Sequence, residues 1–170
     1  MKRAGIVGLM ALVAILAMGV TVALKAETKP ETAVMPENTV QALPVVQVYK
    51  NASCGCCKEW VKHLEANGFS VQAHDVDNLL PYKDQAKLGA GMGSCHTAFV
   101  EGYAIEGHVP ARDIKRLLLE KPAISGLTVP RMPIGSPGME VEGRPADAYQ
   151  VLSYKDGKEL GVFTDYPAGK

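Results

Sequence analysis

Apolar and polar positions recur along the chain with two different periods, which divide the region after residue 44 into strands and helices. Short runs rich in β-branched and apolar residues predict strands at residues 45–50, 69–75, 97–101 and 103–107. Apolar residues at helical spacing predict helices at residues 58–67, 79–88 and 111–120. Each helix is closely followed by Gly or Pro, which favour helix ends.

The predicted order is β-α-β-α-β-β-α, and it resembles the core of the thioredoxin fold. We therefore expect an α/β protein with a thioredoxin-like core. A C-terminal extension should follow from about residue 123 to residue 170. Its first part, residues 123–148, is rich in Pro and Gly and predicts a loop, whereas residues 149–163 predict a hairpin that turns at Asp156 and Gly157.

The first 26 residues have the composition of an export signal. Lys2 and Arg3 precede an uncharged, mostly apolar run over residues 4–24, which ends before Lys25. The run reaches the roughly 20 residues that cross a bilayer, so a cleaved signal peptide and a retained membrane anchor are both open. Residues 27–44 are rich in Pro, Thr and Glu and predict a flexible linker, and residues 45–170 form the expected folded domain. We expect the domain to work outside the cytoplasm.

Charge gives no reason to expect a polyanionic partner. Lys and Arg together number 18, as do Asp and Glu, which leaves a net charge of zero. A basic patch for nucleic acid is therefore not expected, and contact with a membrane is expected only through the N-terminal segment. The function should come from a local site.

The four cysteines are the strongest candidates for that site. Cys54, Cys56 and Cys57 stand between the first predicted strand and the first predicted helix, and Cys95 precedes the third strand. In a thioredoxin-like core these two segments pack together, so Cys95 and His96 should face the other three cysteines. A helix N-terminus stabilises a thiolate, which suits reactive or metal-binding thiols.

Four sulfurs and an imidazole suit a soft metal ion, with Cu(I) and Zn(II) as the main choices. His96 is a candidate ligand or a group that orients one, and His108 either contributes to the site or caps the following helix. Met132 and Met139 bracket a loop rich in Pro and Gly, RMPIGSPGM, where a core role is a poor explanation. Since thioether binds copper rather than zinc, these methionines favour Cu(I).

Three motifs in this order, CGCC, SCHTAFVEGYAIEGHVPA and VPRMPIGSPGME, resemble the CopG-like family of bacterial exported copper-resistance proteins, long classed as a domain of unknown function. The resemblance spans about residues 45–143 and implies periplasmic copper handling on a thioredoxin-like fold. It also implies a polynuclear copper cluster held by Cys54, Cys56, Cys57 and Cys95. Other periplasmic copper carriers or an efflux system would be the expected partners besides copper ions.

Three functions remain open from the sequence. The first is a copper-binding protein that stores Cu(I), or one that also interconverts Cu(I) and Cu(II) as a copper oxidoreductase. The second is a thiol-disulfide oxidoreductase using Cys54 and Cys57. Against it stand Cys56 inside the motif and the absence of proline between Pro81 and Pro110, where thioredoxins place a cis-proline. The third is a structural site, with zinc on four cysteines or two disulfides. We assign no catalytic residue.

Overall fold

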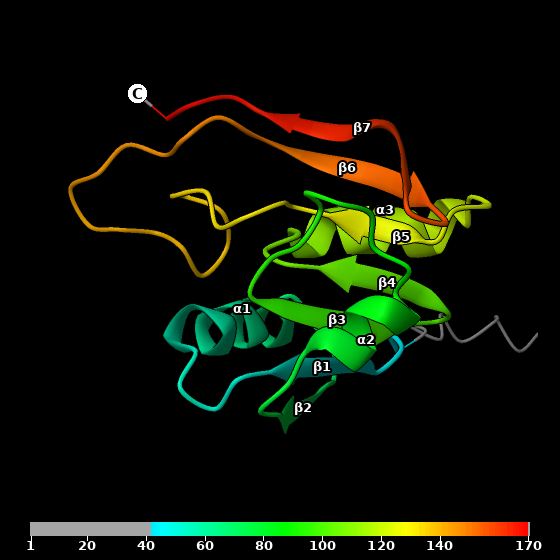
Figure 1. Cartoon of the computed structure of the whole chain (residues 1–170). Coiled ribbons are helices and arrows are strands. Elements are labelled where there is room, and N and C mark those ends of the chain that lie inside the picture. The colour runs from blue at the N-terminus through cyan, green and yellow to red at the C-terminus, as the bar shows by residue number, and fades with distance from the viewer. Residues whose placement is uncertain (1–41, 170) are drawn as a thin grey trace, which may run out of the picture. The chain divides into compact units, whose positions relative to one another are not determined.

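A mixed sheet organises residues 42–169, the part of the chain that the computed structural model describes (Figure 1). The strands are β1 (Val46–Lys50), β2 (Val71–Asp75), β3 (His96–Val100), β4 (Tyr103–Glu106), β5 (Gly126–Thr128), β6 (Tyr149–Lys155) and β7 (Lys158–Tyr166). The helices are α1 (Gly55–Ala66), α2 (Leu80–Gln85) and α3 (Ala111–Glu120). The predicted export segment, residues 1–26, lies outside the described residues.

The strands lie in the order β2-β1-β3-β4-β5-β6-β7. Two neighbouring pairs are parallel, β1 with β2 and β4 with β5, and the helices α1 and α3 make the two crossovers. The other pairs are antiparallel. From β1 to α3 the order is the predicted β-α-β-α-β-β-α, so the expected thioredoxin-like α/β fold is confirmed.

Both faces of the sheet are covered. On β3 and β4, Ala98 and Ile105 belong to the main core together with residues of α1 and α3. Their strand neighbours Phe99 and Ala104 belong instead to a second cluster with Ala86, which follows α2. Because successive side chains of a strand point to opposite faces, α1 and α3 cover one face and α2 lies on the other, as Figure 1 shows.

Helix α1 begins earlier than the sequence predicts. Its apolar stripe is the one that the helical spacing predicts, with Trp60 and Leu64 one turn apart and fully buried. The helix nevertheless begins at Gly55, with Cys54 as its N-cap, and the predicted start at residue 58 is wrong. The periodic residues stand only in the later turns, so the pattern missed the first turn, where two of the cysteines lie.

The C-terminal extension adds strands to the sheet. The turn of the hairpin falls at Asp156 (φ 46°) and Gly157 (φ 78°), as predicted, and left-handed residues at both positions suit a tight hairpin. The prediction that residues 123–148 form only loop is wrong, because β5 lies there between β4 and β6. Three residues are too few to show a period in the sequence. A Cβ on Gly126 would lie 1.9 Å from the carbonyl oxygen of Ala104, so this pairing needs glycine.

The first residues that the structure describes pack against the folded domain. Leu43 is partly buried and packs on the main core. The division into an export segment, a linker at residues 27–44 and a folded domain at residues 45–170 stays a prediction. No helix within residues 42–169 has the length and apolar character needed to cross a membrane.

Candidate metal site

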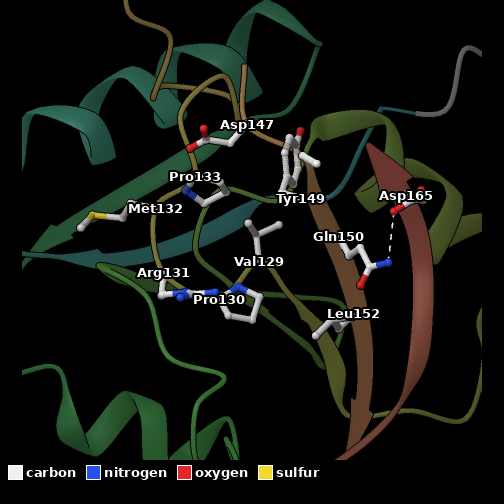
Figure 2. A pocket seen from close by; sticks show the side chains of 11 residues that line it. Val129, Pro130, Arg131, Met132, Pro133, Asp147, Tyr149, Gln150, Leu152 and Asp165 are labelled. Atoms are coloured by element: carbon white, nitrogen blue, oxygen red, sulfur yellow. Dashed lines mark hydrogen bonds between the residues drawn. The ribbon is translucent and has the colours of Figure 1, made fainter. Parts of the chain in front are cut away.

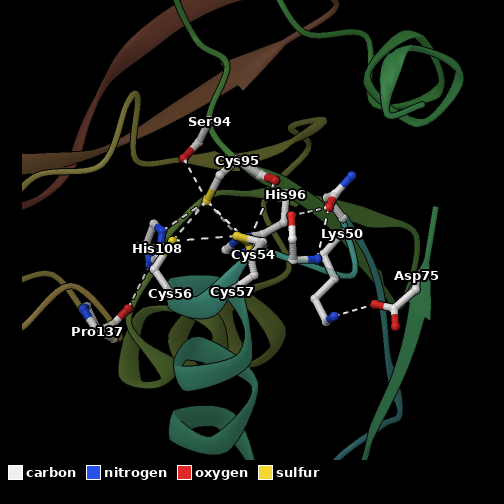
Figure 3. The surroundings of a disulfide bond; sticks show 12 residues. Lys50, Cys54, Cys56, Cys57, Asp75, Ser94, Cys95, His96, His108 and Pro137 are labelled. Carbon is white, nitrogen blue, oxygen red and sulfur yellow. Dashed lines mark hydrogen bonds and ion pairs between the residues drawn. A yellow bond between two sulfur atoms is a disulfide. The ribbon is translucent and has the colours of Figure 1, made fainter. Parts of the chain in front are cut away.

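The four cysteine sulfurs meet between the first turn of α1 and the start of β3 (Figure 3). Cys54 and Cys57 form a disulfide, whereas Cys56 and Cys95 are free thiols. The Sγ of Cys95 lies 3.5 Å from that of Cys57 and 3.9 Å from that of Cys56. All four sulfurs lie within 4.8 Å of one another, so the structure brings together every cysteine that the sequence singled out.

Two imidazoles flank Cys95. The Nε2 atom of His108 lies 3.1 Å from the Cys95 sulfur, and the Nδ1 atom of His96 lies 3.4 Å from it. His108 Nδ1 is 2.8 Å from the carbonyl oxygen of Pro137. Since a carbonyl only accepts, Nδ1 carries the proton and Nε2 presents its lone pair to the cysteine. This is the arrangement that orients a metal-binding histidine.

Burial sets the protonation of these groups. It lowers the pKa of His108, and it lowers the pKa of His96 well below the usual range, so both imidazoles are neutral near pH 7. Burial, together with the neighbouring Cys56, raises the pKa of Cys95. The Cys95 thiol therefore keeps its proton and donates it to His108 Nε2. A metal ion that binds this sulfur must displace the proton.

His96 is fully buried and keeps one ring nitrogen without a partner. Its Nε2 atom is the one buried side-chain nitrogen or oxygen within residues 42–169 that lacks a hydrogen bond. The ring lies 4.3 Å from the ring of Trp60, whose Nε1 donates to the carbonyl of Val109 at 2.9 Å. Trp60 thus belongs to the core and packs against the ring of His96. A buried nitrogen without a hydrogen bond lowers the free energy of unfolding. The unpaired Nε2 atom therefore indicates that His96 has a function besides packing.

A buried carboxylate holds the segment that carries Cys95. Glu106 on β4 is fully buried and accepts hydrogen bonds from the Ser94 amide at 2.6 Å and from the Thr97 hydroxyl at 2.7 Å. It also forms an ion pair with Lys83 of α2, whose ammonium donates to the Ser94 carbonyl at 3.0 Å. Residues on both sides of the Cys95-His96 pair are therefore clamped.

The pattern of the sequence does not reveal this clamp. The one available signal was Glu106 itself, a lone charge among apolar neighbours in the predicted strand YAIEG. A carboxylate rarely lies in such a place without a partner. Nothing in the sequence identifies Lys83 as that partner.

Two glycines let backbone segments approach the site. A Cβ on Gly107 (φ 69°) would lie 2.5 Å from the Cβ of Ser94, next to Cys95. A Cβ on Gly138 (φ 83°) would lie 2.7 Å from the carbonyl oxygen of Cys56. Gly138 thus brings the loop of Pro137 onto the first turn of α1, which places the Pro137 carbonyl against His108.

The two predicted thioethers have different surroundings. Met132 is 48% exposed and lines a cavity of about 670 Å³ together with Arg131 and Tyr149 (Figure 2). Met139 is half-buried and lies one residue beyond Gly138, in the loop that contacts α1. Their assignment as ligands remains a prediction, and Met139 lies nearer in the chain to the backbone that contacts the site.

The remaining histidines have structural contacts. His63 Nε2 accepts a hydrogen bond from the Ala111 amide at 3.1 Å at the start of α3. His74 is exposed on β2 and stacks on Tyr49 at 4.9 Å between ring centroids. Neither belongs to the groups of residues within 42–169 that could share a metal ion.

The donor set decides which ions fit. Within residues 42–169, two groups of residues could each share one metal ion, and they offer sulfur and imidazole nitrogen but no carboxylate. One group is Cys54, Cys56, Cys57 and Cys95, and the other is Cys95, His96 and His108. Hard ions such as Mg²⁺ and Ca²⁺ prefer oxygen, so they do not fit. Soft or borderline ions fit, and Cu(I) and Zn(II) are the main members of that class.

Comparison with known proteins identifies the family of this chain. Residues 92–139 match a family model described as a protein of unknown function, DUF411. Two solved structures, entitled copper resistance protein CopG in Form 1 and Form 2, are 44% and 45% identical to this chain. Each aligns over 74% of this chain with a TM-score of 0.68, and the alignment covers 98% and 99% of the two solved chains. This chain belongs to the CopG-like copper-resistance family.

Membership in the CopG-like family agrees with the resemblance found in the three motifs. The family-model match begins at Met92 and ends at Met139, so it covers Cys95, both site histidines and the Pro137 loop. The CGCC motif lies outside that match. No curated protein matches the chain.

Proposed function

We propose that this protein binds Cu(I) through its cysteine thiolates and so takes part in copper resistance. The supporting observation is the convergence of four sulfurs within 4.8 Å of one another beside two neutral imidazoles. In the reduced chain Cys54, Cys56, Cys57 and Cys95 would all be available. Since one thiolate bridges two Cu(I) ions, four sulfurs this close suit a polynuclear cluster.

Copper is preferred over zinc because the solved relatives are entitled copper-resistance proteins. His108 is the best-placed nitrogen donor, since the Pro137 carbonyl holds its proton on the far side of the ring. His96 is the second, because its Nδ1 atom lies 3.4 Å from the Cys95 sulfur. Copper ions are the cargo of this site, taken up and passed on.

The proposed place of work is the periplasm. The N-terminal 26 residues have the composition of an export signal, whether cleaved or kept as an anchor in the inner membrane. Cys54, Cys56 and Cys95 are each partly exposed, so copper ions could pass between this site and a carrier or an efflux system at the surface. Periplasmic copper carriers and efflux proteins are therefore the proposed partners.

The test is anaerobic titration of the reduced protein with Cu(I) against a competing chelator. We expect more than one Cu(I) per chain and a drop in affinity of at least about 100-fold in Cys95→Ser, because the Cys95 sulfur contacts those of Cys56 and Cys57 as well as both histidines. Ser53→Ala, an exposed neighbour of Cys54, is the matched control and should bind like the parent protein. Weak binding by the parent, or an unchanged affinity in Cys95→Ser, would refute the proposal.

A thiol-disulfide oxidoreductase is the second candidate, and the Cys54–Cys57 disulfide at the start of α1 favours it. A disulfide between residues three apart in a first helical turn is the arrangement that such enzymes use. The test is reduction of a protein disulfide by the copper-free dithiol form. A useful rate that copper does not change would favour this candidate over copper binding.

A further inference from the structure

Helix α1 holds the short segment between β4 and α3 through two side chains. Trp60 and His63 lie three residues apart on α1, so both project from the same side of the helix. The Nε1 atom of Trp60 donates a hydrogen bond to the Val109 carbonyl at 2.9 Å, and the Nε2 atom of His63 accepts one from the Ala111 amide at 3.1 Å. These two bonds fix the backbone one residue and three residues after His108.

The bond to His63 caps helix α3. Pro110 is the N-cap residue of α3 and makes no hydrogen bond with its side chain. The first amides of a helix have no acceptor within that helix, so the Ala111 amide needs an acceptor from another part of the chain. His63 supplies this acceptor from the neighbouring helix α1.

His63 can accept this bond only as a neutral ring. Since the Ala111 amide donates, the Nε2 atom of His63 presents its lone pair and the ring proton lies on Nδ1. Burial lowers the pKa of His63, although the nearby Glu140 carboxylate acts in the opposite direction. A neutral acceptor also suits the positive end of the α3 dipole, which would repel a charged imidazole.

The segment held by α1 determines where the His108 ring starts from. The Pro137 carbonyl, 2.8 Å from His108 Nδ1, sets the tautomer of that ring, and His108 Nε2 lies 3.1 Å from the Cys95 sulfur. The backbone of His108 is placed instead by the segment that follows it. Helix α1 therefore carries three of the cysteines at its start and also fixes the segment that follows the best-placed imidazole.

We propose that His63 is a positioning residue of the metal site, which holds the Ala111 amide and thereby keeps His108 where its Nε2 atom binds copper. This inference rests on the proposed copper-binding function and adds a residue outside the ligand set. His63 belongs to neither group within residues 42–169 that could share an ion, and its Nε2 lone pair is already used. Unlike the fully buried Trp60, His63 is only partly buried, so replacing it opens no large cavity in the core.

The experiment is anaerobic Cu(I) competition titration of the reduced protein and of two variants. His63→Leu leaves the Ala111 amide without its acceptor and should lower Cu(I) affinity about 10-fold. His63→Gln offers a carbonyl oxygen at about the reach of Nε2 and should stay within about threefold of the parent. Asp113→Ala removes two other hydrogen bonds of α3 and is the control for lost stability, so it should bind like the parent.

A double-mutant cycle tests whether His63 acts through His108. In a His108→Ala background, His63→Leu should lower Cu(I) affinity by less than about twofold, because the ring that it positions is already gone. A general loss of structure would lower the affinity equally in both backgrounds. Hydrogen exchange of the Ala111 amide in the copper-free protein should be faster in His63→Leu and close to parental in His63→Gln.

A parental affinity in His63→Leu would overturn the inference, and so would an affinity in His63→Gln as low as that in His63→Leu. An undiminished effect of His63→Leu in the His108→Ala background would also overturn it, because His63 would then act on another part of the site. A parent protein that binds no Cu(I) would refute the proposed copper-binding function itself. The exchange of the Ala111 amide would still report whether His63 caps α3.

Discussion

Two buried carboxylates hold two different parts of this molecule, and their surroundings differ in one respect. Asp113 on α3 accepts hydrogen bonds from the Thr164 hydroxyl at 2.6 Å and the Tyr166 hydroxyl at 2.5 Å, which fasten β7 to the helix. Glu106 on β4 accepts from the Ser94 amide and the Thr97 hydroxyl and pairs with Lys83. We call these sets the hairpin clamp and the site clamp.

The hairpin clamp is complete in itself. Its donors find acceptors within the protein, and Arg116 closes it by donating to the Phe163 carbonyl at 2.6 Å. The site clamp instead fixes the segment that carries the free thiol of Cys95 and the ring of His96, whose Nε2 atom has no partner. Both clamps satisfy a buried charge, but only the site clamp positions groups that still need a ligand. This difference identifies the functional end of the domain.

Removing the carboxylate of the site clamp should have the largest effect. Glu106→Ala leaves the Lys83 ammonium and the Ser94 amide without their acceptor, so we expect a loss of about 3–5 kcal/mol in the free energy of unfolding. Because Cys95 and His96 would also lose their fixed position, Cu(I) affinity should fall by about 10- to 100-fold. Urea unfolding and Cu(I) competition measure the two effects. Glu106→Gln keeps one acceptor and should recover part of both, and an unchanged copper affinity in Glu106→Ala would show that the clamp does not position Cys95.

The matching change in the hairpin clamp should affect stability alone. Asp113→Ala leaves two hydroxyl donors unpaired, and we expect a loss of about 1–3 kcal/mol in the free energy of unfolding. Copper affinity should stay within about twofold of the parent, since the hairpin clamp supplies no contact to the cysteines. The same two measurements apply. A large drop in copper affinity would mean that the two clamps are coupled.

Acid should lower the free energy of unfolding through the two histidines of the site, His96 and His108. The pKa values of His96 and His108 are lowered by burial, so below pH 6.5 the unfolded chain takes up protons that the folded chain refuses. Their contribution to stability is present above pH 6.5 and is lost as pH falls toward their folded pKa values. Each histidine contributes a slope of up to about 1.4 kcal/mol per pH unit.

Urea unfolding of the copper-free, reduced protein at pH 7 and pH 5 measures this loss. His96→Gln should show a shallower slope than the parent, whereas Asp113→Ala should keep the parental slope. Equal slopes in the parent and in His96→Gln would mean that His96 takes up its proton in the folded state.

The two predicted thioether ligands should give the smallest effects. Met139 follows the loop that contacts α1, so Met139→Leu should lower Cu(I) affinity by about fivefold if its sulfur completes the site. Met132 is 48% exposed beside a separate cavity, and Met132→Leu should change the affinity by less than about twofold. Competition titration of both variants in parallel tests the pair. Equal losses would place both methionines in the site, and two unchanged affinities would exclude both.

Much of the fold could be predicted because its signals are local. The helix over residues 111–120 was predicted at its observed bounds, since its buried residues recur at helical spacing and prolines flank it. The Asp156-Gly157 turn and the order of elements up to α3 followed from similar short-range patterns. The family was also recognisable, because three separate motifs stood in the right order.

By itself, the sequence therefore determined the thioredoxin-like order of elements, the neutral charge, and the presence of soft donors beside the first helix and the third strand. Only the tertiary structure decided that Cys54 pairs with Cys57, that Lys83 neutralises Glu106, and that the Pro137 carbonyl sets the tautomer of His108. Periodicity reports which face of an element is buried. It carries no information on which atoms meet, because residues 29 positions apart, such as His108 and Pro137, come together only when loops and strands have packed.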